Sequence, residues 1–565
     1  MIEIKLYNSL TTVFPDREAN GETLKKITAC LNQPVSFQMA YKITDNSEKC
    51  TDFVMRIKSE LDINIYYENY VSFLHTTSVQ TDTTVGLFPD TLLPKSINPK
   101  LEALKSPWGD LIVEKGEDTL LTAYEDSWQA VWFCINEKGR KQQPGTHNIE
   151  IELYNGCEEL VGSAMLQVDV LPAKLSPQKL IYTNWFHCDC LADIYNVEIF
   201  SDRFFCIMSD YVKKAVLNGM NMIMVPAFTP PLDTPIDGER MTAQLVKVKR
   251  TGDKYEFDFS LMKRFIDICR KCGIKYFEHS HFFTQWGATA APKIVAEADG
   301  KTKKIFGWKT KATGKAYVSF LRQYIEELKK FLKEEKLEKR MLFHISDEPE
   351  KKDLETYRAA RNTVIDMLDG YMVGDAMSNV EIYEQGLCQM PICIVDTIHD
   401  FIGKCKNLWA YYVGLSANNA ASNRIFHIPR ECNRMIGVQL YYYNIRGFLQ
   451  WGYNYYYGTQ SRYMFNPSIN QTGSFHLPGT AYMVYPAFDG TAYQSIRQKI
   501  FAEGLNDIRL LTLLEKCCGR EKCEDIINKH FGEPKFDKKP ESSEKYMDFI
   551  NEVYAVIKKT CTAER

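Results

Sequence analysis

The sequence predicts a multidomain protein with an N-terminal antiparallel β-sandwich, a (β/α)8 barrel of the TIM type, and C-terminal helices packed on the barrel. Three observations predict this fold class. The chain of 565 residues exceeds what one hydrophobic core normally serves. Strand-like segments with turn signals fill its first part, and strand and helix patterns alternate from about residue 178 onward. We therefore expect the sandwich at residues 1–172, the barrel at 173–495 and the helices at 496–565.

The β-sandwich is predicted from short segments rich in β-branched and aromatic residues. Residues 35–41 are one such segment, and no strong helical period occurs in this part of the chain. Turn dipeptides such as Pro144-Gly145 separate the segments, as expected for antiparallel strands. The last two strands are expected around 147–154 and 164–171, so the domain should end at Pro172.

The barrel is predicted from apolar strand candidates that alternate with helical patterns. The candidates are 180–187, 220–226, 274–280, 341–346, 371–376, 391–396, 408–413 and 446–451. Ser201 can cap a helix that runs to Asn218, and Gly273 stands where a helix C-cap is needed before the next strand. Such an alternation matches a (β/α)8 barrel in number and size. A doubly wound open sheet is the alternative, but no Gly-rich phosphate-binding loop follows the first strand.

Beyond residue 495 the chain has a helical period. It is seen at 495–514, 521–530 and 543–558. We expect these segments to form helices that pack on the barrel, with their charged residues on the solvated side.

The composition narrows the classes of partner. A formal net charge of −3, from 69 basic and 72 acidic residues, argues against nucleic acid or an anionic membrane. No segment approaches the ~20 apolar residues of a membrane span, and the N-terminus lacks the apolar run of a signal peptide.

The cysteines predict a reducing compartment. There are 17 of them, an odd number, and they are scattered along the chain and not spaced in pairs, so we expect reduced thiols in the cytoplasm. Cys269 and Cys272 lie on a predicted helix with no second pair, so we expect no metal or other cofactor. The oligomeric state stays open.

Two adjacent acids end the fourth predicted barrel strand. This strand, 341–346, is followed by Asp347, Glu348 and Pro349, and the proline ends the ladder. Active sites of such barrels lie at the C-terminal ends of the strands, so both acids should face the cleft or its rim. An acidic helix N-terminus is the alternative interpretation.

The adjacency of Asp347 and Glu348 limits their chemistry. Neighbouring Cα atoms lie about 3.8 Å apart, so the two side chains do not easily reach both faces of a sugar ring, as an ordinary pair of catalytic carboxylates does. They can serve a substrate that brings its own nucleophile, the 2-acetamido oxygen. In that scheme one acid orients the amide and the other protonates the leaving oxygen.

Polar and aromatic residues at other strand ends suit a neutral carbohydrate, because aromatic faces cover the C–H side of a pyranose and Asn, Asp and His bind hydroxyls. Trp185, Asp189, His281 and Gln285 belong to this inventory. The predicted substrate-binding residues are Asn184, His187, His279, Trp286, His344, Asp375, Asn379, Gln450, Trp451 and Tyr453. For any single aromatic, core packing is the competing interpretation, and a metal at His279 and His281 would need a third ligand that is not near in sequence.

Three segments resemble one known family. They are 344–349 (HISDEP), 446–454 (RGFLQWGYN), and 485–507, which contains Tyr485-Pro486, 495–497, Glu503-Gly504 and Asp507. They resemble glycoside hydrolase family 123, which comprises β-N-acetylgalactosaminidases, and the likeness covers nearly the whole chain. One departure is 487–490 (AFDG), which is less rich in Gly and Pro than the family pattern.

The resemblance implies a retaining exo-glycosidase that hydrolyses terminal β-linked N-acetylgalactosamine from glycans or glycolipid oligosaccharides through an oxazolinium intermediate. It implies that Asp347 orients the 2-acetamido group and that Glu348 is the general acid/base. The alternatives are a β-N-acetylglucosaminidase and a glycan-binding protein without catalysis. A binding protein needs no acid beside an acid, so the pair favours the enzyme.

Overall fold

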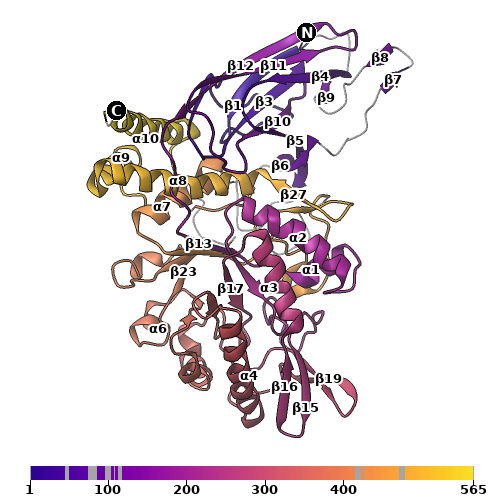
Figure 1. Ribbon diagram of the computed structural model, residues 1–565, viewed down its shortest axis with the longest axis vertical. Coiled ribbons are helices and arrows are strands. Elements are labelled where there is room, and N and C mark those ends of the chain that lie inside the picture. The colour runs from indigo at the N-terminus through magenta and orange to yellow at the C-terminus, as the bar shows by residue number, and fades with distance from the viewer. Residues whose placement is uncertain are drawn as a thin grey trace.

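The computed structural model describes residues 2–44, 50–73, 86–95, 104–106, 109–111, 118–413, 422–426, 428–469 and 478–563. Figure 1 shows a body of β-sheets that contains the N-terminus, a second body of strands and helices below it, and long C-terminal helices, of which α8 crosses between the two. None of the helices in these ranges combines the length and apolar composition that a membrane span needs.

The N-terminal body consists of two facing sheets. The first has the order β1 (Ile2–Asn8), β3 (Val35–Ile43), β10 (Gln129–Ile135), β5 (Ile63–Phe73), β6 (Gly86–Pro94), β27 (Ala492–Ser495) and β26 (Tyr485–Pro486). The second has the order β2 (Lys26–Cys30), β12 (Leu160–Leu171), β11 (Gly145–Tyr154), β4 (Cys50–Lys58) and β9 (Thr119–Tyr124). Only the β12–β2 pair among these is parallel. A short hairpin, β7 (Leu104–Ser106) with β8 (Gly109–Leu111), is separate.

Alternation of side chains builds the core between the two sheets. Phe37 and Phe133 stack from the first sheet, with ring centroids 4.5 Å apart, and Ile151 and Val168 of the second sheet belong to the same cluster. Successive residues of a strand point to opposite faces, so a period of two in the sequence supplies one apolar face per sheet. The predicted antiparallel sheets are therefore present, with one parallel pair added.

The second body is built on a parallel, curled, barrel-like sheet of nine short strands. Its order is β21 (Met372–Val373), β20 (Met341–Phe343), β17 (Tyr276–His279), β14 (Met222–Val225), β13 (Ile181–Asn184), β25 (Gly447–Gln450), β24 (Trp409–Tyr411), β23 (Ile392–Ile394) and β22 (Ala376–Met377). β21 and β22 come from one stretch of chain, and they pair with β20 and β23 respectively. The fifth predicted strand is therefore split in two, which raises the count to nine.

Helices connect most of these strands. They are α1 (Cys188–Ile194), α2 (Asp202–Leu217), α3 (Ser260–Cys272), α4 (Lys315–Glu334), α5 (Leu354–Arg361), α6 (Val380–Glu384) and α7 (Arg430–Tyr442). The predicted end signals of two are confirmed. Ser201 accepts a hydrogen bond from the Phe204 amide at the start of α2, and Gly273 ends α3 with a φ of 111°. Between β23 and β24 the chain forms only a 3-10 turn, Ile398–Asp400, where a full helix would continue the alternation.

Apolar side chains fill the interior of the barrel-like sheet, and a layer of polar side chains lies above them. Interior side chains include Met222, Leu342, Ile392, Trp409 and Leu449, which form one cluster. The opposite faces of the strands pack against the helices in a second, larger cluster. Because both faces are buried, the strands read as continuous apolar runs.

Two insertions follow β14 and β17 and pair with each other. β15 (Lys247–Thr251), β16 (Lys254–Asp258), β18 (Ile294–Ala298) and β19 (Lys301–Phe306) form a small sheet in which β15 and β18 are parallel. They lie on the side of the second body away from the N-terminal sheets, at the bottom of the view in Figure 1.

The C-terminal helices join the two bodies. They are α8 (Ile496–Cys518), α9 (Arg520–Phe531) and α10 (Ser543–Ala563), close to the predicted segments. Their apolar faces share a cluster with Trp132 of the first sheet and Val438 of α7. β27, immediately before α8, pairs with β6, so this segment after the barrel extends the N-terminal sheet.

Candidate active site

The catalytic candidates Asp347 and Glu348 follow β20 at the C-terminal end of the barrel strands. The main chain here is held from both sides. The Trp286 amide donates to the Asp347 carbonyl at 3.0 Å, and the Glu348 amide donates to the Ala376 carbonyl at 3.1 Å. Glu348 adopts a φ of 46°, a left-handed conformation that non-glycine residues rarely take. These contacts fix a backbone shape that directs the two adjacent side chains differently.

The carboxylate of Glu348 is positioned by Tyr411. The phenol of Tyr411, on β24, donates to Glu348 Oε1 at 2.6 Å. Burial and the nearby charge of Glu348 raise the pKa of Tyr411 well above its ordinary value, so the phenol keeps its proton. Glu348 therefore has one oxygen occupied, and its carboxylate is directed toward the β24 side of the barrel mouth, by which we mean the C-terminal end of the parallel strands.

Asp347 lies in a buried environment that contains several other acids. Burial is the largest influence on its pKa, and the charges of Glu348, Asp375 and Asp233 act in the same direction, so the pKa is raised well above 3.8. The cation of His344 opposes this shift. Asp347 therefore ionises at a higher pH than an ordinary aspartate.

A buried histidine, His344, precedes the pair at the end of the same strand. His344 Nε2 is 3.1 Å from Glu278 Oε2, and His344 Nδ1 is 3.6 Å from Asp375 Oδ1. Burial alone would lower its pKa, but the two carboxylates override that effect and raise the pKa to about 9. His344 is thus an imidazolium at neutral pH and partly balances the acids around it.

Glu278 is a buried acceptor that the sequence interpretation missed. It lies on β17 with no exposed surface and accepts hydrogen bonds from the Thr183 hydroxyl and, at 3.0 Å, from Trp185 Nε1. With His344 these residues form the polar layer above the apolar interior. The available signal was an acid inside an apolar strand, because a buried carboxylate requires partners.

Asp375 acts on the catalytic segment through its backbone. Its Oδ1 accepts from the Ile345 amide at 2.8 Å, and its Oδ2 accepts from the Tyr357 hydroxyl at 2.6 Å. It lies where the fifth strand is interrupted and has no exposed surface. Asp375 therefore holds the backbone of residues 345–346 in place and also lies next to the His344 ring.

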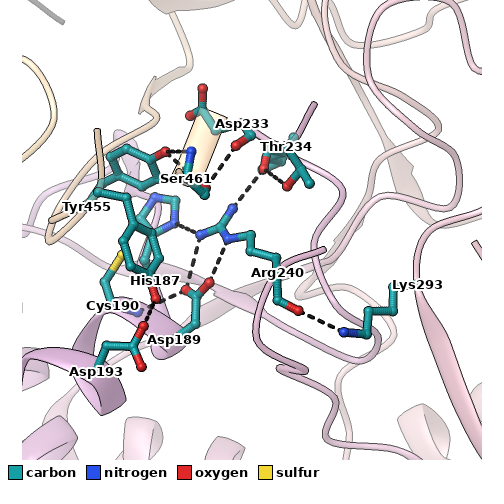
Figure 2. Close-up of polar contacts among 12 residues, drawn as sticks. His187, Asp189, Cys190, Asp193, Asp233, Thr234, Arg240, Lys293, Tyr455 and Ser461 are labelled. Atoms are coloured by element: carbon teal, nitrogen blue, oxygen red, sulfur yellow. Dashed lines mark hydrogen bonds and ion pairs between the residues drawn. The ribbon is translucent and has the colours of Figure 1, made fainter. Parts of the chain in front are cut away.

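His187 belongs to an ion-pair cluster beside the mouth. Arg240 makes two hydrogen bonds to Asp189, at 2.6 and 3.1 Å, and its Nη2 lies 3.2 Å from His187 Nδ1. His187 Nε2 lies 2.9 Å from the Trp451 carbonyl. Burial and the Arg240 charge lower the pKa of His187 to about 4, so it is neutral. Figure 2 shows Arg240 at the centre of these contacts.

The same cluster organises the loop after β14. Arg240 Nη1 donates to the Leu232 carbonyl at 2.7 Å, and the Ser461 hydroxyl donates to the Asp233 carbonyl at 2.8 Å. In Figure 2 the carbonyl of Asp233 faces Ser461, and its carboxylate points away from Arg240. The sequence interpretation did not select Arg240 or Asp233, because both follow a strand end by several residues.

Trp286 provides an aromatic surface near the two acids. It is 50% exposed, and its amide is bonded to the Asp347 carbonyl. Residues 286–288 have successive φ values of 55°, 117° and 53°, so a tight turn sets the position of the Trp286 backbone. An exposed tryptophan anchored to the catalytic segment can cover the apolar face of a sugar.

Four predicted residues lie away from the interior. His279 Nε2 is 2.7 Å from the Tyr324 hydroxyl of α4, and Tyr453 donates to the Tyr211 carbonyl of α2 at 2.9 Å. Asn184 donates to the Tyr182 hydroxyl at 3.4 Å. The Gln450 side chain contacts the groups that surround it: Arg424, Gly452 and Thr480. Asn184, His279 and Gln450 are buried on the outer side of the sheet, because they occupy the opposite parity to the interior residues of their strands. Tyr453 lies beyond the end of β25, and its hydroxyl is directed toward α2.

Asn379 has a local structural partner. Its side chain accepts from the Glu381 amide at 2.9 Å and caps α6.

The predicted site residues thus fall into two groups besides those that point outward or cap a helix. Asp347, Glu348, His344, Asp375 and Trp286 lie around one mouth, and His187 and Trp451 lie in the adjoining cluster. Within the described ranges, no group of three or more His, Cys, Asp or Glu is placed to hold a metal ion.

Comparisons with known proteins bear on the family and on the overall fold. Residues 185–514 match the model of the glycoside hydrolase 123 catalytic domain. Among solved structures, a family 123 glycoside hydrolase from Clostridium perfringens, studied for glycolipid glycan hydrolysis, has a TM-score of 0.74 and 15% identity and covers 100% of this chain and 98% of its own. A β-glucuronidase from Parabacteroides merdae, at 10% identity and a TM-score of 0.30, covers 89% and 51%. No functionally curated protein matches significantly. The likeness to the first structure spans sandwich, barrel and C-terminal helices alike.

Proposed function

The chain belongs to glycoside hydrolase family 123, a family of β-N-acetylgalactosaminidases, and from this membership we propose that it removes terminal β-linked N-acetylgalactosamine with net retention. The reaction uses the substrate's own 2-acetamido oxygen as nucleophile and passes through an oxazolinium ion. Asp347 orients the acetamido group, and Glu348 is the general acid/base. Glycolipid oligosaccharides are a suitable source of the terminal sugar, because the C. perfringens relative was studied on glycolipid glycans.

One observation carries the proposed mechanism: two adjacent acids at one strand exit are anchored to different neighbours. Glu348 is bonded to Tyr411 on one side, and Asp347 is bonded through its carbonyl to Trp286 on the other. A single strand exit places both acids on one side of a bound sugar, where a pair for direct nucleophilic attack would have to flank it. Substrate assistance needs no carboxylate on the opposite face.

The environments of the two acids support their different roles. Asp347 faces the buried imidazolium of His344 and the acids around it, where a carboxylate can accept the acetamide N–H and balance the positive oxazolinium ion. Glu348 has one oxygen on a neutral phenol and the other available for proton transfer to the leaving oxygen. A β-N-acetylglucosaminidase is the second candidate, because the same two acids serve either configuration at C4.

The function is tested first with substrates. The protein should release an aryl group from β-N-acetylgalactosaminides, and the first-formed sugar should retain its configuration by proton NMR. Aryl β-galactosides, which lack the acetamido group, should be nearly inert. Cleavage of a plain β-galactoside at a comparable rate, or inversion, would contradict substrate assistance.

Variants then separate the roles of the two acids. Removing a general acid commonly costs about 10²- to 10⁴-fold, and the loss should shrink when the leaving group needs no proton. Glu348→Ala should therefore steepen the dependence of kcat/KM on leaving-group pKa, whereas Asp347→Asn should slow good and poor leaving groups by similar factors. Glu355→Gln, which changes an exposed acid on α5, is the matched control. Exchanged outcomes would reverse the assignment, and full activity in both variants would place the site elsewhere.

A further inference from the structure

Gln285 has a buried hydrogen-bond donor that the protein leaves unused. The Gln285 side-chain oxygen accepts from the Asp233 amide at 2.9 Å, and the residue is only 5% exposed. Because a backbone amide only donates, this contact fixes which end of the side-chain amide is oxygen. The remaining group, Nε2, has no hydrogen-bond partner among the described residues. A buried N–H without a partner is costly unless a ligand supplies the acceptor.

Asp233, whose amide binds the Gln285 side chain, carries the nearest acidic group in the sequence of this loop. Its amide is bonded to Gln285 and its carbonyl to Ser461, so the backbone of the residue is held from two sides. It adopts a φ of 45°, which Asp and Asn tolerate better than most residues. Its charge is among those that raise the pKa of Asp347, which places it near the catalytic pair.

The order of strands around the barrel locates this donor and acceptor relative to the two acids. Asp233 and Gln285 follow β14 and β17, on one side of β20, and Trp286 links them to the Asp347 carbonyl. The anchors of Glu348 come from β22 and β24, on the other side. If Glu348 faces the oxygen at C1 and Asp347 faces the group at C2, the β14–β17 side receives the next substituents round the ring, at C3 and C4.

We propose that Asp233 and Gln285 together bind one ring hydroxyl on the C3–C4 side of the terminal hexosamine and determine which sugar the site accepts. A hydroxyl donates one hydrogen bond and accepts others, so it can donate to the Asp233 carboxylate while it accepts from Gln285 Nε2. A site built to hydrogen-bond a hydroxyl discriminates strongly against an analogue that lacks it or misplaces it. This inference rests on the proposed function and adds to it the residues that read the sugar.

The test combines variants with altered substrates. Aryl β-glycosides of N-acetylgalactosamine, its 4-epimer, and its 3-deoxy and 4-deoxy analogues are compared on wild type, Asp233→Asn and Gln285→Glu, each at its own pH plateau. Asn suits the backbone at residue 233, and Glu at 285 keeps the acceptor for the Asp233 amide but removes the donor. Asp237→Asn, an exposed position of the same loop that also has a positive φ, is the matched control.

We expect each variant to lose about 10- to 100-fold in kcat/KM on the full substrate, the range for a hydrogen bond to a charged group. On the deoxy analogue that lacks the bound hydroxyl, the same substitution should cost less than about threefold, because the interaction is already absent. The analogue that shows this loss of effect identifies the hydroxyl. Asp237→Asn should match wild type on all four substrates.

Equal losses on both deoxy analogues and on the full substrate would overturn the proposal, because they would assign Asp233 a purely electrostatic or structural effect. If one variant does not fold, as judged by circular dichroism, the other variant alone tests the proposal by the same comparison of the full substrate with the deoxy analogues. If wild type cleaves none of the four glycosides but is folded, the proposed function itself fails and the present inference with it. If wild type cleaves the glycosides but both variants lose the same activity on every substrate, only the present inference fails and the proposed function stands.

Discussion

At the scale of single residues, the two catalytic candidates differ because of what other strands bring to them. Asp347 and Glu348 are chemically similar neighbours, yet one is surrounded by His344, Asp375 and Asp233 and the other is bonded to Tyr411. The positive φ of Glu348 separates their directions. Backbone strain of this kind persists where the surrounding contacts over-determine it, which is common at functional sites.

The raised pKa of Asp347 predicts the acid side of the pH profile. Asp347 must be ionised to accept the acetamide N–H, so activity should fall as pH drops through its pKa. That pKa lies above 3.8, and the imidazolium of His344, with a pKa of about 9, stays charged in this range. The midpoint of the acid limb of kcat/KM should therefore lie at a higher pH than 3.8, the pKa of an ordinary aspartate, and Asp233→Asn should move it lower. An acid limb at or below this ordinary value in wild type would contradict the prediction.

At the scale of elements, β24 and β25 pack closely against each other inside the barrel through one large and one small residue. Trp409 of β24 lies across Gly447 of β25, and a Cβ built on residue 447 would be 2.2 Å from the indole. Only glycine leaves room for the ring. The same strand β24 carries Tyr411, so the packing of Trp409 also sets the position of the phenol that holds Glu348.

Gly447→Ala should therefore reduce both stability and activity. Overpacking of a buried site commonly costs about 1–3 kcal/mol, and a shift of β24 should lower kcat through Tyr411. Urea unfolding and aryl-glycoside kinetics measure the two effects, and Trp409→Leu in the same chain should restore part of the stability. Gly307→Ala, where the nearest atom would be 3.6 Å from the new Cβ, is the control. Equal unfolding midpoints for Gly447→Ala and wild type would show that the strand adapts freely.

At the scale of the whole molecule, the sandwich and the barrel are joined by shared elements. β27 comes after the barrel strands but pairs with β6, and α8 begins at the next residue. Arg497 of α8 is bonded to Asp90 of β6 at 3.0 Å, and both are nearly fully buried. The predicted boundary at 495/496 thus falls between two elements that connect the two bodies.

The Asp90–Arg497 pair should contribute to the cohesion of the molecule. Removing one partner of a buried ion pair leaves an uncompensated charge and commonly costs about 3–5 kcal/mol. Asp90→Ala should therefore lower the unfolding midpoint strongly, and adding Arg497→Met should recover part of the loss. Glu152→Ala, which removes an acid from an exposed pair with Lys58, should stay close to wild type. The prediction fails if Asp90→Ala and Glu152→Ala have the same midpoint.

The sequence by itself determined the type of each part of the chain and the family. Periods of two and 3.6 residues depend only on local geometry, so β3, α2 and the C-terminal helices lie close to their predicted ranges. The resemblance to family 123 is confirmed by the match of residues 185–514 to the family model. The sequence could show it because each motif that carries it is a contiguous segment. The roles of Asp347 and Glu348, the galacto preference and the cytoplasmic location stay predictions.

Only the tertiary structure decided which face of each barrel strand points inward. Both faces of a parallel strand are buried and apolar, so the sequence does not distinguish the interior parity from the exterior one. For that reason Asn184, His279 and Gln450 were selected although they point outward, and Glu278 and Tyr411 were not selected although they point inward. Asp233, Gln285 and Asp347 become neighbours only when strands far apart in sequence align their C-terminal ends, and a local pattern contains no information about that alignment.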